Sequence, residues 1–260
     1  MTRAPMHAAR KPAQRAERLA YLVTCEHGGN EIPPPYVALF RPHQALLESH
    51  RGYDPGALAL AQTLACALGA RLLTSTISRL LVELNRSPGR QFRYSPVMRN
   101  ATSAVRAEIC RHHYTPHWTA AEAFVRDAVA NGQHVVHVAS HSFTPSLDGD
   151  VRRTDVGLLY DPAREFERSL CVAWQAALAA RMPQWTARRN YPYRGTGDGL
   201  TRYLRTRFED ASYCGIELEI NQKHVHDGRA IAARERAAVV AALRDALASF
   251  AKEPGASGFP

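Results

Sequence analysis

Two histidines stand where an apolar run gives way to small and polar residues, a position at which a side chain can do chemistry. His27 lies in the segment CEHGGN, directly after LAYLVT, and His141 lies in SHSFTP, directly after HVVHVA. Zinc in hydrolases takes two or three histidine or carboxylate ligands and keeps one coordination position open for water. Gly28 and Gly29 would let the backbone approach such a site closely. The sequence therefore predicts one zinc ion bound by His27 and His141.

A third ligand to this ion is expected, and the sequence offers two main candidates. Glu31 is the nearest acid after His27, and Asp54 stands at the start of a predicted helix, after HRGY. A role as helix N-cap would also explain Asp54 without any metal. Glu26 is less suitable, because neighbouring residues of an extended strand point to opposite faces. Both Glu31 and Asp54 remain candidates on this reasoning.

The segment GIELEIN offers a general base. Its isoleucines and leucine share one face of a strand, and Glu217, Glu219 and Asn221 share the other. Two carboxylates on one face of a central strand are costly to bury unless they are paired or functional. An edge strand with a solvated polar face is the alternative. Of the two acids we favour Glu219 as the base, because it stands nearer the carboxyl end of the strand, and Glu217 is second.

Several further polar residues are candidates for contact with a substrate. Asn85 and Arg86 leave a strand-like run, SRLLVELN, into a Ser-Pro-Gly turn, and an arginine can bind a carboxylate through two parallel hydrogen bonds. Arg79, earlier in the same run, is the candidate for stabilising a developing oxyanion. Arg194 in YPYRGTGDG could contact a second carboxylate or simply be a solvated loop residue. Ser142, in the second histidine segment, completes the predicted substrate-binding set.

The elements that must position these residues alternate between strands and helices. Such alternation predicts a mainly parallel sheet with helices on both faces, in which ligands bind near the carboxyl ends of the strands. The predicted strands cover residues 21–25, 71–76, 134–140, 156–160 and 213–221, and the predicted helices cover 54–70, 117–132, 162–182 and 229–250.

Length and composition fit one globular domain. The chain has 260 residues, 45% of them hydrophobic, and no apolar stretch long enough to span a membrane. We expect a flexible basic arm over residues 1–18, a single domain over 19–250 and a frayed tail over 251–260. Five scattered cysteines without a CxxC pair favour a reducing cytoplasm over a disulfide framework.

The net charge of +9 could indicate a nucleic acid or an acidic small substrate. No recognition-helix pattern, RNA-binding aromatic motif or zinc finger accompanies the basic residues, so we expect no specific nucleic-acid partner. An acidic small molecule is the expected partner.

The same residues resemble the N-formylglutamate amidohydrolase family, along nearly the whole predicted domain. The motifs that carry the resemblance are, in chain order, CEHGGNEIP, YDPGA, SRLLVELNRS, YTPHW, HSFTP, VGLLYDPAR, NYPYRGTGDGLTRYLR and GIELEINQ. The resemblance implies an α/β sandwich around a mixed sheet, similar to zinc carboxypeptidases and aspartoacylases. It also implies metal-dependent hydrolysis of N-formyl-L-glutamate to formate and glutamate, a reaction of histidine degradation.

Carried over to this chain, the resemblance implies that His27, Asp54 and His141 hold zinc. It further implies that Glu219 is the base, and that Asn85 and Arg86 hold the substrate carboxylate. The chain departs from the carboxypeptidase signature at one point, because the position three residues after His27 is an asparagine.

Three other functions are compatible with the sequence. One is a carboxypeptidase-like metallopeptidase acting on peptides or cell-wall fragments. Another is a thiol hydrolase that uses Cys25 with His27, since both share a face of an extended segment. The third is a metal-free binding module for acidic metabolites.

Overall fold

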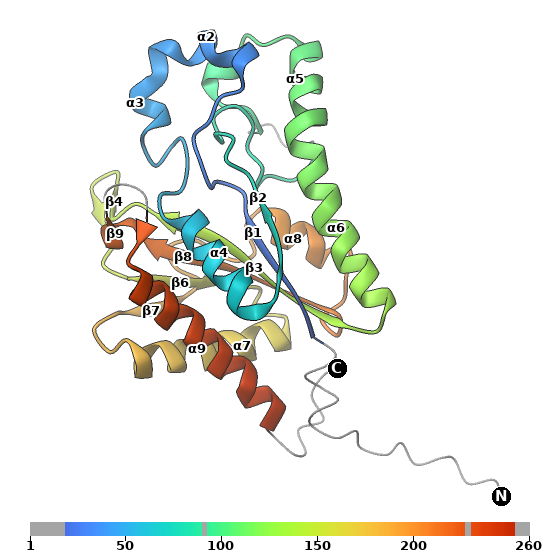
Figure 1. The fold of residues 1–260 in the computed structure, drawn as a ribbon, viewed down its shortest axis with the longest axis vertical. Helices are drawn as coiled ribbons and strands as arrows, with labels where there is room; N and C mark the ends of the chain where they lie inside the picture. The colour runs from blue at the N-terminus through green and yellow to red at the C-terminus, as the bar shows by residue number, and fades with distance from the viewer. Residues whose placement is uncertain (1–18, 90–92, 227–229, 253–260) are drawn as a thin grey trace, which may run out of the picture.

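The computed structural model describes residues 19–89, 93–226 and 230–252 (Figure 1). The predicted basic arm and residues 253–260 of the predicted tail lie outside the described residues. Within the part that is described, no helix is both long enough and apolar enough to cross a membrane.

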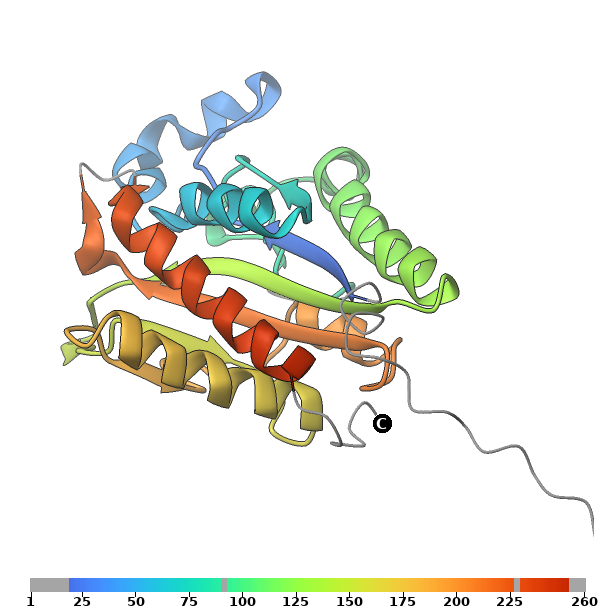
Figure 2. The same cartoon turned by 60° about the horizontal axis from the view of Figure 1, so that its bottom comes forward.

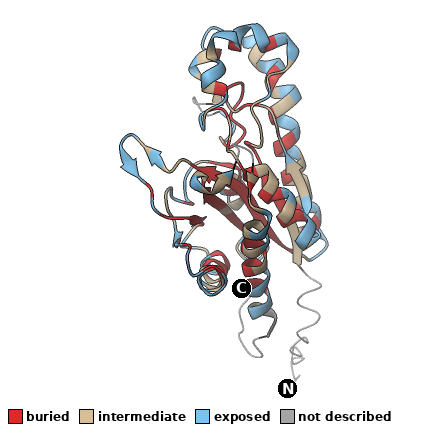
Figure 3. Cartoon of the chain, turned by 60° about the vertical axis from the view of Figure 1, so that its left-hand side comes forward, coloured by how far each residue is buried: buried red, intermediate tan, exposed pale blue. Residues whose placement is uncertain are grey.

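A six-stranded mixed sheet forms the centre of the fold. Its strand order is β2-β1-β3-β8-β6-β7; the first four strands run parallel to one another, and β6 pairs antiparallel with β8. Most residues of the central strands are buried, as Figure 3 shows. The predicted mixed, mainly parallel sheet is confirmed. The strands are β1 (Leu19–Cys25), β2 (Arg71–Thr74), β3 (His134–Phe143), β6 (Val156–Leu159), β7 (Ala187–Arg189) and β8 (Tyr213–Asn221).

Helices cover both faces of this sheet, as predicted (Figures 1 and 2). One face packs against α4, α7 and α9 through a first hydrophobic cluster that includes Val138 and Ile216. The other face packs against α5, α6 and α8 through a second cluster that includes Val135 and Tyr213. The helices that cover the sheet are α4 (Ala57–Leu68), α5 (Ser103–Ile109), α6 (Thr115–Ala130), α7 (Glu165–Arg181), α8 (Leu200–Arg205) and α9 (Ala233–Lys252).

Strand alternation sends the acids and His141, at the carboxyl ends of the central strands, to the second face. Glu26 directly follows β1 and continues the alternation of Leu22, while His141 shares its face of β3 with Val135. Glu219 likewise shares its face of β8 with Tyr213. The titratable side chains of these strands therefore gather at the carboxyl-terminal part of one face. The remaining α-helices and β-strands of the described residues are short: α2 (Val37–Phe40), α3 (Gln44–Leu47), β4 (Ser146–Leu147), β5 (Asp150–Val151), β9 (Val225–His226) and β10 (Ala230–Ile231).

The start of α4 differs from the prediction in a way that matters for the site. The residue that caps the helix is Gly56, in a left-handed conformation with φ 83°, and not Asp54. A glycine adopts this conformation without steric penalty. The side chain of Asp54 is therefore free of the helix and available for other partners. The predicted end at Gly69 is confirmed, since this residue is the C-cap with φ 62°.

The strand-like run before Asn85 is not a strand, which corrects the prediction. Its apolar residues pack into the second cluster, but its backbone forms turns: Leu81 N donates to Ser78 O, and Glu83 N donates to Arg93 O. The Ser78 hydroxyl also donates to the Gly52 carbonyl. Alternating apolar residues are buried here without a partner strand, so a two-residue period alone does not identify a strand.

His137 makes the stability of the fold depend on pH. It lies fully buried in β3, between the hydroxyls of Thr24 (2.9 Å) and Tyr213 (2.7 Å). Burial lowers the pKa of His137 to about 3. The unfolded chain takes up a proton near the ordinary histidine pKa of about 6.5, so stability is complete above that pH and is lost as the pH falls towards about 3.

We expect the change His137→Gln to make the free energy of unfolding less sensitive to acid. Between about pH 6 and 4 the slope should decrease by about 1.4 kcal/mol per pH unit, the contribution of one proton. Urea unfolding at a series of pH values measures this slope. The exposed His50→Gln variant is the control and should keep the wild-type slope. An unchanged slope in His137→Gln would contradict the assignment.

Candidate active site

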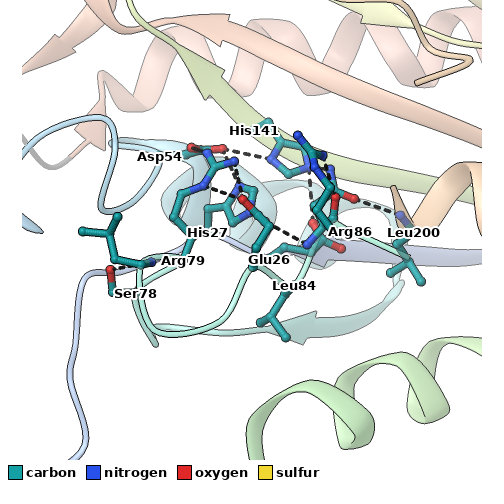
Figure 4. A network of polar contacts seen from close by, with 12 residues as sticks. Glu26, His27, Asp54, Ser78, Arg79, Leu84, Arg86, His141 and Leu200 are labelled. Atoms are coloured by element: carbon teal, nitrogen blue, oxygen red, sulfur yellow. Dashed lines mark hydrogen bonds and ion pairs between the residues drawn. The ribbon is translucent and has the colours of Figure 1, made fainter. Parts of the chain in front are cut away.

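Three buried side chains from separate elements converge on the second face of the sheet. His27 lies in the turn after β1, Asp54 lies before α4, and His141 lies in β3 (Figure 4). Asp54 Oδ2 is 3.2 Å from His27 Nδ1 and 2.9 Å from His141 Nδ1, and the two ring centroids are 5.1 Å apart. Ligand atoms of all three lie within 4.8 Å of one another, so they could hold one metal ion. The predicted pair of imidazoles is close enough to share a cation.

Two further carboxylates bind the outward nitrogens of these imidazoles. Glu83 Oε1 contacts His27 Nε2, and Glu26 Oε2 lies 3.3 Å from His141 Nε2. The other oxygen of Glu26 is 3.3 Å from His117 Nε2. Because His27 Nε2 is hydrogen-bonded to Glu83, Nδ1 of this ring is left as the unprotonated atom that can bind a metal. His141 Nε2 lies against both Glu26 and the side-chain amide of Asn85. This is the arrangement expected of a metal centre and not of isolated core histidines.

The charge of the cluster also suits a divalent cation. Glu26, Asp54 and Glu83 contribute three negative charges and Arg79 one positive charge, which leaves −2 while both imidazoles are neutral. Although burial opposes ionisation, hydrogen bonds from His117 and His141 keep the pKa of Glu26 below its usual range. The pKa values of Asp54 and Glu83 are lowered by their contacts with His27 and Arg79.

Both ligand histidines respond to this negative charge. Burial alone would lower the pKa of each ring, yet Glu83 and Asp54 raise the pKa of His27, and Asp54 and Glu26 raise that of His141 well above its ordinary value. The site therefore attracts positive charge, which a proton supplies when no cation is bound. A donor set of two imidazoles and one carboxylate with this charge fits zinc or a similar divalent ion.

Arg79 is held by acids within the cluster. Its Nε and one terminal nitrogen donate to Glu83 Oε2 at 2.8 and 2.6 Å, and the other terminal nitrogen donates to Asp54 Oδ1 at 3.2 Å. In both Glu83 and Asp54, Arg79 therefore binds the oxygen that does not contact a histidine, and it holds the two carboxylates in position. Because the guanidinium is committed in this way, the geometry gives no support to the predicted oxyanion role, which stays a prediction.

Glu219 stands beside the cluster with an oxygen available for proton transfer. It pairs in register with His141 across the two central strands, and its Oε2 is buried without a hydrogen-bond partner. Burial, reinforced by the negative charges of Asp54 and Glu217, raises the pKa of Glu219 to about 8. A carboxyl with a pKa near neutrality can both accept and return a proton.

Glu217 differs from Glu219 in its surroundings. Its Oε1 accepts a hydrogen bond of 2.7 Å from the Thr201 hydroxyl of α8. The strand that carries both acids lies inside the sheet, between β3 and β6, so the alternative of a solvated edge strand is wrong. Glu217 is therefore engaged by a hydroxyl, whereas Glu219 has an oxygen without a hydrogen-bond partner, which makes Glu219 the better candidate for the base.

Asn85 and Arg86 lie next to the cluster but are partly engaged. Asn85 Nδ2 is 3.4 Å from His141 Nε2, and its Oδ1 accepts from Leu200 N at 2.9 Å. Arg86 donates through one terminal nitrogen to the carbonyls of Asn85 (2.8 Å) and Asp198 (3.1 Å). These bonds fix the position of the Arg86 side chain, whose role as a carboxylate anchor stays a prediction.

The other two predicted substrate contacts are placed differently. The Ser142 hydroxyl is occupied, because it donates to Pro55 O at 2.7 Å and accepts from Gln222 Nε2 at 3.1 Å. Arg194 is exposed in the loop before α8. The structure gives neither residue a contact with the metal cluster.

The structure also argues against two alternatives that the sequence left open, Glu31 as the third metal ligand and Cys25 as a nucleophile. Glu31 is exposed and accepts a hydrogen bond from the Thr76 hydroxyl at 2.8 Å, so it is not part of the cluster. Cys25 is fully buried among apolar side chains of the opposite face, and burial raises the pKa of its thiol well above the ordinary value. A thiolate nucleophile at this position is not supported.

We expect the change Glu26→Gln to weaken metal binding by about 10- to 100-fold, because outer carboxylates orient a ligand histidine and increase its basicity. Titration of the metal-free protein with zinc and a competing chelator measures this affinity. Glu31→Gln, an acid-to-amide change at an exposed position after the same strand, should leave it unchanged. Equal affinities for wild type and Glu26→Gln would refute the outer-carboxylate role.

Comparison with known proteins identifies the family of the chain. A model of the N-formylglutamate amidohydrolase family matches residues 19–225. Among solved structures, gene product Atu2144 from Agrobacterium tumefaciens is 29% identical, with 88% of this chain and 91% of that chain covered and a TM-score of 0.73. N-formylglutamate amidohydrolase from Ralstonia eutropha JMP134 is 19% identical, with coverage of 90% and 93% and a TM-score of 0.65, a likeness of fold. Among curated proteins, no sequence matches.

Proposed function

Because the chain belongs to the N-formylglutamate amidohydrolase family, we propose that it hydrolyses the amide bond of a small N-acylated acidic amino acid, with N-formyl-L-glutamate as the substrate and formate and L-glutamate as the products. The observation that carries the proposal is the convergence of His27 Nδ1, His141 Nδ1 and Asp54 Oδ2 beside Glu219. We further propose that the metal is a single zinc ion.

The residues divide the work of hydrolysis among them. A zinc ion held by His27, Asp54 and His141 would polarise the acyl carbonyl and lower the pKa of a water to about 7. Glu219 accepts a proton from the attacking water as the new C–O bond forms. It then returns this proton to the amine nitrogen as the C–N bond breaks, so that glutamate leaves as an amine.

Substrate binding depends on positive groups outside the metal cluster. Arg86 lies close enough to the site to lower the pKa of Glu83, and a guanidinium at this place can bind a carboxylate of the substrate. The net charge of +9 would favour the approach of a dianion, an effect that salt would weaken.

A hydrolysis assay with defined acyl groups tests this function. The zinc-loaded protein is offered N-formyl-L-glutamate, N-acetyl-L-glutamate and a glutamyl peptide, and the release of amine is followed. The proposal predicts fastest turnover of the N-formyl compound and loss of activity after removal of the metal by a chelator. Faster cleavage of the peptide, or undiminished activity in the chelated protein, would refute it.

A further inference from the structure

Arg152 is a buried cation without an acidic partner. Only 8% of the residue is exposed. One terminal nitrogen donates to the Tyr193 hydroxyl at 3.1 Å, and the guanidinium carbon lies 5.2 Å from the centre of the same ring. Over residues 19–89, 93–226 and 230–252, no carboxylate forms an ion pair with it. A buried charge that is not compensated by the protein destabilises the fold unless a ligand neutralises it.

The backbone around Arg152 is held firmly against the end of the central strand. The fully buried Asn221 donates through Nδ2 to the carbonyls of Arg152 (2.8 Å) and Thr154 (2.9 Å). Arg152 N donates to Pro145 O at 2.8 Å, which closes the loop that follows β3. Asn221 is the last residue of β8, so the position of Arg152 is tied to the sheet and not to a free loop.

This attachment brings Arg152 to the same end of the sheet as the proposed base. Asn221 lies two residues beyond Glu219 on the same face of β8, a distance of about 7 Å along the strand. The segment that carries Tyr193 runs beside Glu219 as well. The carbonyl of Tyr191 occupies the space that a Cβ on Gly157 would need, and Gly157 is the strand partner of Glu219.

Arg152 is buried although the next residue, also an arginine, is exposed. Arg153 is exposed, although it follows Arg152 directly and stands on the same segment. Arg194, which the sequence suggested for a second carboxylate, is exposed too. Among these three arginines, only Arg152 is both withdrawn from solvent and fixed relative to Glu219.

We propose that Arg152 is a specificity-determining residue that binds the side-chain carboxylate of the substrate, while Arg86 binds its α-carboxylate. The proposal deepens the proposed function and rests on it. A guanidinium has five N–H donors in a planar fork, and this one has donors left over after its bond to Tyr193. Two parallel hydrogen bonds to a carboxylate would neutralise the buried charge and would distinguish an acidic side chain from its neutral amide.

The change Arg152→Gln in the zinc-loaded full chain tests this role. Steady-state rates with N-formyl-L-glutamate and with its neutral counterpart N-formyl-L-glutamine give the specificity. We expect kcat/KM for the glutamate compound to fall by about 10- to 100-fold, mainly through KM, as for a lost charged hydrogen bond. The rate with the glutamine compound should stay nearly the same. Arg153→Gln, which removes the same charge from an exposed neighbour, should leave both substrates unaffected.

An equal loss for both substrates would show that Arg152 only supports the fold, and no loss would show that it does not touch the substrate. Either result overturns the proposal. Calorimetric measurement of the binding of L-glutamate and L-glutamine to the zinc-loaded protein tests the role of Arg152 independently of the proposed reaction. If no N-formyl amino acid is hydrolysed but glutamate still binds more tightly than glutamine through Arg152, the reaction is wrong and the anchor stands. If wild type binds the two amino acids equally, the anchor is refuted.

Discussion

Replacing Glu219 with glutamine is expected to slow turnover by about 10²-fold or more, while the protein keeps its metal. Glutamine has the same shape but cannot accept the proton of the attacking water. Since Glu219 is not one of the three clustered ligand side chains, the zinc content should be unchanged. Single-turnover and steady-state rates with N-formyl-L-glutamate, together with the metal content of the same preparation, measure both parts of the prediction.

Glu217→Gln is the matched control for this experiment. It removes a carboxylate from the same face of β8, but from a position whose oxygen is bonded to Thr201. We expect a much smaller loss of turnover. If Glu217→Gln were the severe variant and Glu219→Gln the mild one, the role of base would belong to Glu217.

His141→Ala should have the other large effect, a loss of both stoichiometric zinc and detectable activity. The change removes one of three candidate ligands, and it also removes the imidazole that lies between Glu26 and Asp54. Three protein ligands are the usual minimum for a catalytic zinc site. Metal analysis after dialysis, followed by assay with and without added zinc, measures the result.

His134→Ala controls for the general cost of removing a buried histidine from β3. This residue lies at the opposite end of the same strand, where its Nδ1 contacts the Ala211 carbonyl at 3.0 Å. The variant should bind zinc as wild type does, even if it is less stable. A His141→Ala protein that retained a full equivalent of zinc would exclude this residue as a ligand.

The parts of the site that the sequence predicted are those governed by local patterns. Alternation from Ile216 to Asn221 predicted the common face of Glu217 and Glu219, and the predicted strand over residues 213–221 has the bounds of β8. The end of an apolar run predicted the place of His27, in the turn after β1. His141 was expected directly after a strand ending at residue 140, but β3 continues to Phe143, so His141 lies within the strand. Strand period and burial depend on near neighbours in the chain, so they can be read without the fold.

The parts that could not be predicted depend on contacts between distant residues. Glu83 meets His27 only because the run before Asn85 turns instead of extending, and nothing in its apolar pattern distinguishes the two. Arg152 and the exposed Arg153 are identical neighbours in sequence. Their difference arises from the bonds that Asn221 makes to the backbone of Arg152 and Thr154, about 70 residues away along the chain. The antiparallel direction of β6 is likewise set by its pairing with β8.

Anomalous diffraction at the zinc edge, from crystals grown with one equivalent of zinc, asks most directly whether the cluster is a metal centre. We expect one strong peak at about 2.0–2.2 Å from His27 Nδ1, His141 Nδ1 and an oxygen of Asp54. Crystals that show zinc elsewhere, or no zinc between these three side chains, would contradict the proposal that the two histidines and Asp54 bind a catalytic ion.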